Sequence, residues 1–247
     1  MLITISTESL KGYGLNRIFG FAKQAGFDGI DLAMETSDYD TLNADYIKEL
    51  IEESGIPVTS IQTPKATSKT KIEAAVRMAK KLDTKIIVIQ PPKLLNVKLV
   101  TWLKKEIPKI RQKENISIAL ENAPSKTMLG FIPEYSMNNI GELKKFKHAC
   151  LDTSRSAEKK EDLIRVYKSL SKFLVQIHLS NVYRGKSYAP PETGILPIES
   201  FLSKLKQDKF KGVISLRIKP SNLKAGNDDK LLENITSSLK FCRKFLD

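Results

Sequence analysis

Eight short runs rich in Ile, Val and Leu recur along the chain, and a segment with the spacing of an amphipathic helix follows each one. The expected strands span residues 2–6, 28–33, 58–62, 86–90, 116–121, 148–152, 174–178 and 213–218. The expected helices span residues 15–25, 44–54, 69–82, 97–112, 136–146, 158–172, 198–208 and 229–245. Parallel neighbouring strands need such crossover segments, and eight units are enough to close the sheet. The pattern predicts an α/β fold, a (β/α)8 TIM barrel, with an open doubly wound sheet as the structural alternative.

A single domain over residues 1–247 is expected, because 247 residues suit one complete barrel and no Gly/Ser-rich linker or charge block divides the chain. Asn43 is placed to cap the second helix, and Gly26 and Gly55 are placed to end the first two. Two longer irregular stretches, 123–135 and 181–197, follow strands at the barrel end where functional loops are expected.

The composition points to a reduced cytoplasmic protein without a membrane span. No apolar stretch approaches the roughly 20 residues needed to cross a bilayer. The first residues are typical of a strand and lack the pattern of a signal peptide. Cys150 and Cys242 are the only cysteines, and this usage favours a reducing compartment.

A formal net charge of +13 favours anionic partners. Lys and Arg are dispersed over nearly every expected helix, with no basic run interleaved with aromatics. A solvated lysine-rich surface is therefore favoured over a dedicated nucleic-acid face. A small phosphorylated or carboxylated ligand also fits this charge.

Three expected strand ends carry Glu121, Asp152 and His178, and the last expected strand carries Arg217 near its end. Because the carboxyl ends of barrel strands face one shared pocket, we expect these side chains to lie together there. Each residue also has a purely structural interpretation. The two carboxylates could cap helices or pair with surface lysines, and His178 could be a structural hydrogen-bonding residue. Arg217 could turn outward into solvent.

Several short motifs occur in a fixed order along the chain: IALEN at 118–122, CLDTS at 150–154, HLSN at 178–181, PPETGILPI at 190–198 and VISLRIKP at 213–220. Together they resemble the xylose isomerase-like TIM barrel superfamily, over nearly the whole chain. That group includes sugar isomerases, ketose 3-epimerases, inosose dehydratases, hydroxypyruvate isomerases and endonuclease IV repair enzymes.

The resemblance implies one divalent cation, Mn²⁺ or Mg²⁺, held by a Glu, an Asp, a His and a second Glu. Motif matching places the first three metal ligands at Glu121, Asp152 and His178, and gives Glu121 the catalytic role of a proton-transfer carboxylate. The fourth ligand position falls on Arg217. Our hypothesis is that the metal site is degenerate: Arg217 stands in for the cation and pairs with Glu121 or Asp152, so that no metal is bound.

Three arginines are expected to bind the substrate: Arg155, Arg184 and Arg217. Arg184 lies in the segment Tyr183-Arg-Gly-Lys186, which resembles the part of sugar epimerases where an Arg contacts substrate hydroxyls. Arg155 and Arg217 offer fixed guanidinium charges to an anionic ligand.

Three functions follow from this reading. The first is a sugar or sugar phosphate isomerase or epimerase with an altered site, in which Asp152 and His178 either hold a metal or polarise a substrate oxygen. The second is a catalytically impaired protein that binds a sugar or a small anion. Nucleic-acid processing in the manner of endonuclease IV is disfavoured, because Gln62 and Gln90 stand where that family has zinc-binding histidines. The sequence leaves open the substrate, the retention of catalysis and the formation of a homo-oligomer.

Overall fold

Eight parallel strands close into a barrel, which confirms the predicted (β/α)8 TIM barrel and excludes the open sheet. The computed structural model describes residues 1–246. The barrel strands are β1 (Leu2–Ser6), β2 (Gly29–Ala33), β3 (Val58–Gln62), β4 (Ile86–Ile89), β5 (Ser117–Glu121), β8 (Ala149–Asp152), β9 (Leu174–Leu179) and β12 (Val213–Leu216). Hydrogen-bonded neighbours follow the order β1-β12-β9-β8-β5-β4-β3-β2, and the pairing of β1 with β2 closes the ring.

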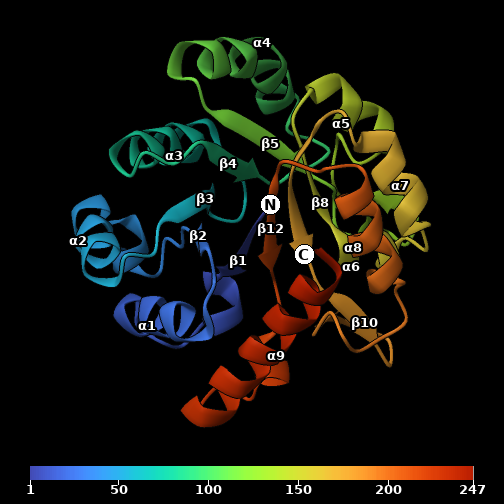
Figure 1. Cartoon of the computed structure of the whole chain (residues 1–247). Helices are drawn as coiled ribbons and strands as arrows, with labels where there is room; N and C mark the ends of the chain where they lie inside the picture. Colours follow the sequence, from blue (N-terminus) through green and yellow to red (C-terminus); the bar gives the residue numbers. More distant parts are fainter. Residues whose placement is uncertain (247) are drawn as a thin grey trace.

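Helices form an outer ring around these strands (Figure 1). They are α1 (Leu15–Ala25), α2 (Ala44–Ser54), α3 (Lys69–Lys81), α4 (Val97–Glu114), α5 (Ile140–Phe146), α6 (Thr153–Glu158), α7 (Leu163–Leu170), α8 (Ile198–Gln207) and α9 (Asp228–Leu246), with short 3-10 turns η1 (Thr7–Leu10), η2 (Tyr39–Leu42) and η3 (Pro220–Leu223). The predicted caps are confirmed. Asn43 Oδ1 accepts the N–H groups of Asp45 and Tyr46, while Gly26 and Gly55 end α1 and α2 in the left-handed conformation that glycine adopts without strain.

Side-chain alternation along the strands separates an apolar outer face from a polar interior. In β5 and β8, Ile118, Leu120 and Leu151 belong to the main hydrophobic cluster under the helices. Burying each such side chain stabilises the fold by about 1.5–3 kcal/mol. Glu121 directly follows Leu120, and Asp152 directly follows Leu151. Because successive strand residues face opposite sides of a sheet, Glu121 and Asp152 point into the barrel.

Most predicted elements agree with the structure to within two residues at each end, but two helices differ. The helix expected at 136–146 begins only at Ile140, because Ser136 is bound to the loop before α4 through its N–H and hydroxyl, both of which donate to Pro92 O. The helix expected at 158–172 is two helices, α6 and α7. The first begins directly after β8, because the Asp152 side chain caps it.

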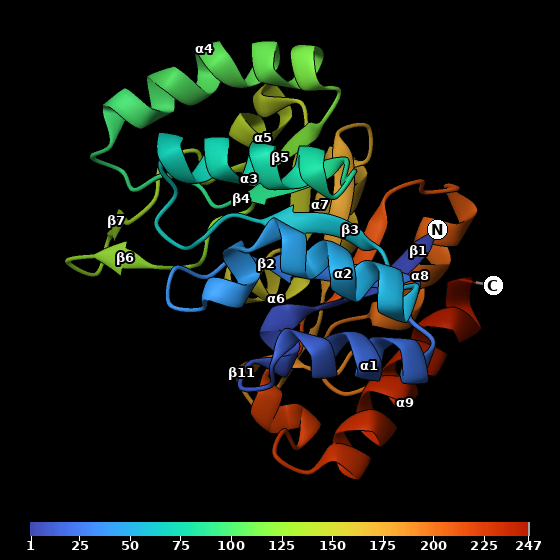
Figure 2. The same cartoon turned by 90° about the vertical axis from the view of Figure 1, so that its left-hand side faces the viewer.

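Two of the loops expected at the functional end of the barrel contain small hairpins. The first pairs β6 (Thr127–Met128) with β7 (Ile132–Pro133), and the second pairs β10 (Asn181–Tyr183) with β11 (Lys186–Ala189). In Figure 2 the β6–β7 hairpin stands out on the side of the barrel opposite both chain termini. None of the helices in residues 1–246 is both long and apolar enough to span a lipid bilayer.

Candidate functional site

Glu121, Asp152 and His178 lie together inside the carboxyl end of the barrel. Glu121 ends β5, Asp152 ends β8, and His178 is the second-last residue of β9. Asp152 and His178 are direct register partners across β8 and β9. All three side chains are buried, so their polar atoms depend on one another and on nearby cations for partners.

Arg217 points into the same cluster from the end of β12. Its Nη1 lies 2.8 Å from Glu121 Oε1, 3.2 Å from His178 Nδ1 and 3.4 Å from Asp152 Oδ2. Its Nη2 forms an ion pair with Glu8, and its guanidinium carbon lies 5.6 Å from the centre of the Tyr188 ring. A fixed positive charge therefore lies among the three side chains that the sequence matched to metal ligands.

Arg155 brings a second guanidinium to Glu121. Asp152 Oδ1 accepts the backbone N–H of Arg155 at 3.0 Å, which starts α6 and turns the Arg155 side chain into the barrel. Arg155 Nη1 forms an ion pair with Glu121 Oε2 and donates to Asn122 O at 2.9 Å. Both carboxylate oxygens of Glu121 are therefore bound by guanidinium groups.

His178 lies between two carboxylates. Its Nδ1 is 2.5 Å from Glu121 Oε1, and its Nε2 is 3.2 Å from Asp31 Oδ2. The Gln176 amide nitrogen is placed 2.9 Å from Nε2, and its amide oxygen, which has no partner among the described residues, is the atom that would accept the Nε2 proton. Because a neutral imidazole can donate from one nitrogen only, two facing carboxylates favour the doubly protonated ring.

Asp31 is fixed from two other strands, β3 and β12. Its two carboxylate oxygens accept hydrogen bonds from Ser60 at 2.7 Å, Gln62 at 2.7 Å and Ser215 at 2.9 Å. Asp31 is fully buried, and with these donors it forms a rigid support beneath His178.

The charges of the cluster shift its pKa values in opposite directions. Burial would raise the pKa of Glu121, but Arg155 and Arg217 outweigh it and hold that pKa well below the ordinary value. Burial also opposes a charge on His178, yet the carboxylates of Glu121 and Asp31 raise its pKa well above the ordinary value. Burial keeps the pKa of Asp152 raised, with the Glu121 charge acting in the same direction.

Glu121, Cys150 and His178 offer ligand atoms within 4.8 Å of one another and could hold a metal ion. Their chemistry is mixed, since a thiolate suits soft ions whereas a carboxylate suits hard ones. Burial raises the pKa of the Cys150 thiol, which disfavours the thiolate form that binds metals.

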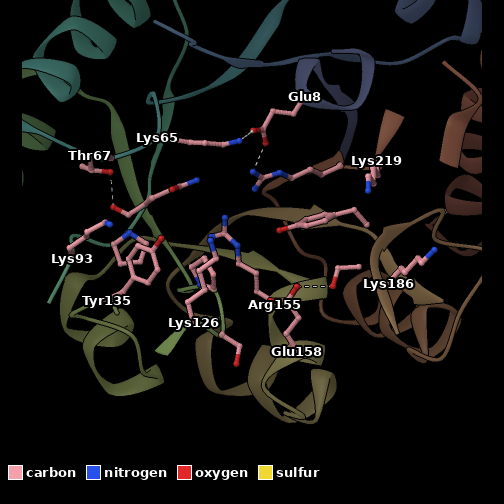
Figure 3. A pocket seen from close by; sticks show the side chains of 18 of the residues that line it. Glu8, Lys65, Thr67, Lys93, Lys126, Tyr135, Arg155, Glu158, Lys186 and Lys219 are labelled. Atoms are coloured by element: carbon pink, nitrogen blue, oxygen red, sulfur yellow. Dashed lines mark hydrogen bonds and ion pairs between the residues drawn. The ribbon is translucent and has the colours of Figure 1, made fainter. Parts of the chain in front are cut away.

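A cavity of about 1370 Å³ opens above the cluster at the mouth of the barrel (Figure 3). Basic side chains outnumber acidic ones along its wall. The charged lining residues are Lys65, Lys93, Lys126, Arg155, Lys186, Arg217 and Lys219 on the positive side and Glu8 and Glu158 on the negative side. The excess of basic side chains in this wall favours an anionic ligand.

Arg184 is the one matched arginine that lies apart from this cluster. It occupies the turn of the β10–β11 hairpin with a positive φ of 50°, is exposed, and stacks on Tyr183 at 5.1 Å. It does not belong to the cavity wall formed by the described residues, whereas Arg155 and Arg217 do.

Sequence reasoning assigned no chemical role to Glu8, Asp31 or Tyr188, although it placed Asp31 near the end of the second strand, toward the barrel mouth. Asp31 carried a usable signal, because a carboxylate inside the apolar run Ile30-Asp31-Leu32 must find buried partners. Glu8 and Tyr188 carried none, because a 3-10 turn and a hairpin bring them to Arg217 from distant parts of the chain.

A family model described as xylose isomerase-like TIM barrel matches residues 19–245. Among solved structures, D-allulose 3-epimerase from Methylomonas sp. in complex with D-allulose is 14% identical, with a TM-score of 0.74 over 99% of this chain and 96% of that chain. The IOLI protein with a binding zinc atom is 14% identical, with a TM-score of 0.75 over 98% of each chain. The probable 3-DHS dehydratase AsbF from Bacillus anthracis is 15% identical, with a TM-score of 0.71 over 97% of this chain and 98% of that chain. The search of curated proteins found no match.

Proposed function

The chain belongs to the xylose isomerase-like TIM barrel family, and from this premise we propose that it binds a small sugar ligand at the barrel mouth without a divalent metal. Arg217 takes the place of the ion. The observation that carries this proposal is the position of Arg217 Nη1, 2.8–3.4 Å from Glu121, His178 and Asp152. A guanidinium there neutralises the carboxylates as a cation would.

Electrostatics supports the exclusion of an ion while Arg217 stays in place. A divalent ion about 4 Å from a guanidinium would be repelled by roughly 8 kcal/mol at an effective dielectric constant of about 20. A doubly protonated His178 also has no free lone pair to give to a metal. The four buried or half-buried carboxylates of Glu8, Asp31, Glu121 and Asp152 already find cations in Arg155, Arg217 and His178.

The same contacts weaken Glu121 as a base. Its pKa lies well below the ordinary value, because after burial the two guanidiniums dominate its surroundings. A general base works best with a pKa near the working pH. The inherited proton transfer is therefore impaired, while the cavity above it remains able to receive a ligand. The D-allulose complex of one structural neighbour supports a sugar as that ligand.

A metal-dependent isomerase or epimerase is the second candidate. Its support is that Glu121, Asp152 and His178 still converge at the strand ends, and that Glu121, Cys150 and His178 could hold an ion. In that case Mn²⁺ or Mg²⁺ would polarise a sugar oxygen when bound. Turnover of a panel of ketoses and aldoses with added Mn²⁺, abolished by Glu121→Gln, would establish this candidate over the first.

The decisive experiment changes the residue at the fourth position. Arg217→Glu removes the cation and adds a carboxylate beside Glu121 and Asp152, so the repulsion among these groups should destabilise the apo variant and Mn²⁺ should restabilise it. The wild-type protein should show the same melting temperature with Mn²⁺ and with EDTA. Arg217→Gln is the matched control, since it removes the charge without adding a ligand and should respond to Mn²⁺ less than Arg217→Glu.

The proposal fails if the wild-type protein, purified and incubated with metals, retains Mn²⁺, Mg²⁺ or Zn²⁺ at one equivalent after dialysis. Elemental analysis of the dialysed protein gives this result directly, whether or not the variants fold.

A further inference from the structure

Three lysines of the cavity wall have no carboxylate partner within residues 1–246: Lys126, Lys186 and Lys219. The other two lysines of the wall are paired, Lys65 with Glu8 at 3.3 Å and Lys93 with Glu134 at 3.0 Å. The three unpaired ammonium groups keep their full capacity to bind an anion.

These lysines reach the cavity from separate parts of the fold. Lys126 follows β5, Lys186 begins β11 and Lys219 follows β12. Figure 3 shows Lys126 on one side of Arg155, and Lys186 and Lys219 on the other. Free positive charge therefore flanks the opening above the inner cluster.

The two arginines of the wall are occupied differently. Arg217 divides its donors among Glu8, Glu121 and Asp152. Arg155 pairs with Glu121 and, through Nε at 3.6 Å, with Asp152, although this Nε has no hydrogen-bond acceptor within residues 1–246. An incoming anion therefore meets uncommitted charge mainly on the lysines.

We propose that Lys126, Lys186 and Lys219 bind the phosphate group of a phosphorylated sugar. The identity of the sugar end rests on the proposed function, and the phosphate subsite is new. Lysine ammonium groups bind phosphate as compact point charges, and the two arginines of the wall, whose planar forks also match phosphate, are already paired with carboxylates. The cavity of about 1370 Å³ exceeds the roughly 300–1000 Å³ typical of small-ligand pockets, so it has room for a sugar and its phosphate.

The subsite is tested first with inorganic phosphate, in EDTA and at matched ionic strength. Phosphate should raise the melting temperature of the wild-type protein more than chloride does. The triple variant Lys126→Gln, Lys186→Gln, Lys219→Gln should bind phosphate about tenfold more weakly, because three cations no longer attract it. Lys240→Gln, an exposed lysine on α9 outside the cavity wall, is the control and should leave binding unchanged. The absence of a phosphate-specific shift, or an equal loss in Lys240→Gln, overturns the subsite.

The second measurement uses fructose 6-phosphate, fructose and a short oligothymidine. Fructose 6-phosphate should bind more tightly than inorganic phosphate and far more tightly than fructose. If fructose 6-phosphate only equals inorganic phosphate, the subsite stands and the proposed sugar function fails. If the oligothymidine displaces phosphate and binds more tightly than fructose 6-phosphate, the ligand is a nucleic acid and the sugar phosphate assignment is wrong. A metal retained by the wild-type protein would overturn the metal-free proposal without affecting the phosphate result.

Discussion

Arg217 donates from Nη1 to Glu121 Oε1 over 2.8 Å, and this contact joins the last barrel strand to the fifth across the closed interior. Asp152 and Glu8 lie against the same guanidinium. The contact replaces part of the solvation that the buried Glu121 carboxylate lost on folding. One side chain therefore links the stability of the barrel to the electrostatics of its mouth.

Arg217→Met should lower the free energy of unfolding by about 3–5 kcal/mol, because it leaves buried carboxylates without their cation. Urea denaturation at neutral pH measures the loss. Arg165→Met removes an exposed guanidinium from α7 and should change stability by less than about 0.5 kcal/mol. Equal effects of the two substitutions would show that the ion pairs inside the barrel make no net contribution to the free energy of unfolding.

Acid should destabilise the protein partly through Glu121. Its pKa in the folded state lies below its unfolded value, so its contribution to stability is full above about pH 4.5 and declines as the pH falls toward the folded value. Each unit of pKa depression corresponds to about 1.4 kcal/mol. Urea denaturation between roughly pH 3 and 6 should give a flatter pH dependence for Glu121→Gln than for the wild type.

Glu53→Gln is the control for this acid profile, because Glu53 is an exposed carboxylate on α2. Its profile should follow the wild type. Some slope should remain in Glu121→Gln, since His178 also lowers the pKa of the buried Asp31 against the effect of burial. Identical slopes in Glu121→Gln and the wild type would refute a depressed Glu121 pKa.

The strand ends of this fold were predictable because β/α alternation leaves few ways to arrange eight parallel units. That geometry brings Glu121, Asp152 and Arg217 to one end of one barrel, whatever their separation in sequence. Strand phase follows from the same alternation, since Leu216 and Ile218 are buried outside the barrel interior and Arg217 between them must face inward.

The remaining features of the site depend on loop conformations that periodicity does not encode. Glu8 reaches Arg217 from a short 3-10 turn, and Tyr188 reaches it from a hairpin in a segment that was expected to be irregular. Arg184 was expected to bind the substrate, but it lies in the two-residue turn of the β10–β11 hairpin, which directs its side chain into solvent. In such segments a single turn type decides which side chain faces the cavity.

Gly194→Ala should cost about 1–3 kcal/mol and disorder the loop over residues 190–197. A Cβ atom at Gly194 would lie 2.5 Å from Asn181 Cγ and Val182 O, on a backbone with φ of +131°. Asn181 accepts the N–H of Leu196 at 2.9 Å, so displacing it also releases the loop. Gly20→Ala within α1 meets no atom within 4 Å and should instead stabilise the protein by about 0.5–1 kcal/mol. Urea denaturation of both variants measures the contrast, and a neutral Gly194→Ala would contradict it.

The two histidines should both fail to titrate between about pH 5.5 and 8, for opposite reasons. Burial, together with the nearby Arg111, lowers the pKa of His148 to about 4, so this ring stays neutral. His178 stays protonated, because the carboxylates of Glu121 and Asp31 overcome the effect of burial and raise its pKa. Nitrogen-15 NMR distinguishes the two forms by chemical shift. A His178 signal that moves through a midpoint near 6.5 would contradict the ion-pair geometry.

Asp31→Asn should lower the pKa of His178 while preserving the shape of the support beneath it. The substitution keeps the side-chain volume, but it removes the negative charge 3.2 Å from Nε2. Since the folded pKa of His178 exceeds its unfolded value, its contribution to stability is full below about pH 6.5 and is lost as the pH rises through the folded value. The loss should therefore begin near the same pH in both proteins but be smaller and end at a lower pH in Asp31→Asn, and the NMR titration should shift with it. Asp229→Asn on α9 removes an exposed carboxylate and should leave the His178 titration in place. If both variants titrate as the wild type does, the charge on His178 does not depend on Asp31 and Glu121 must hold it alone.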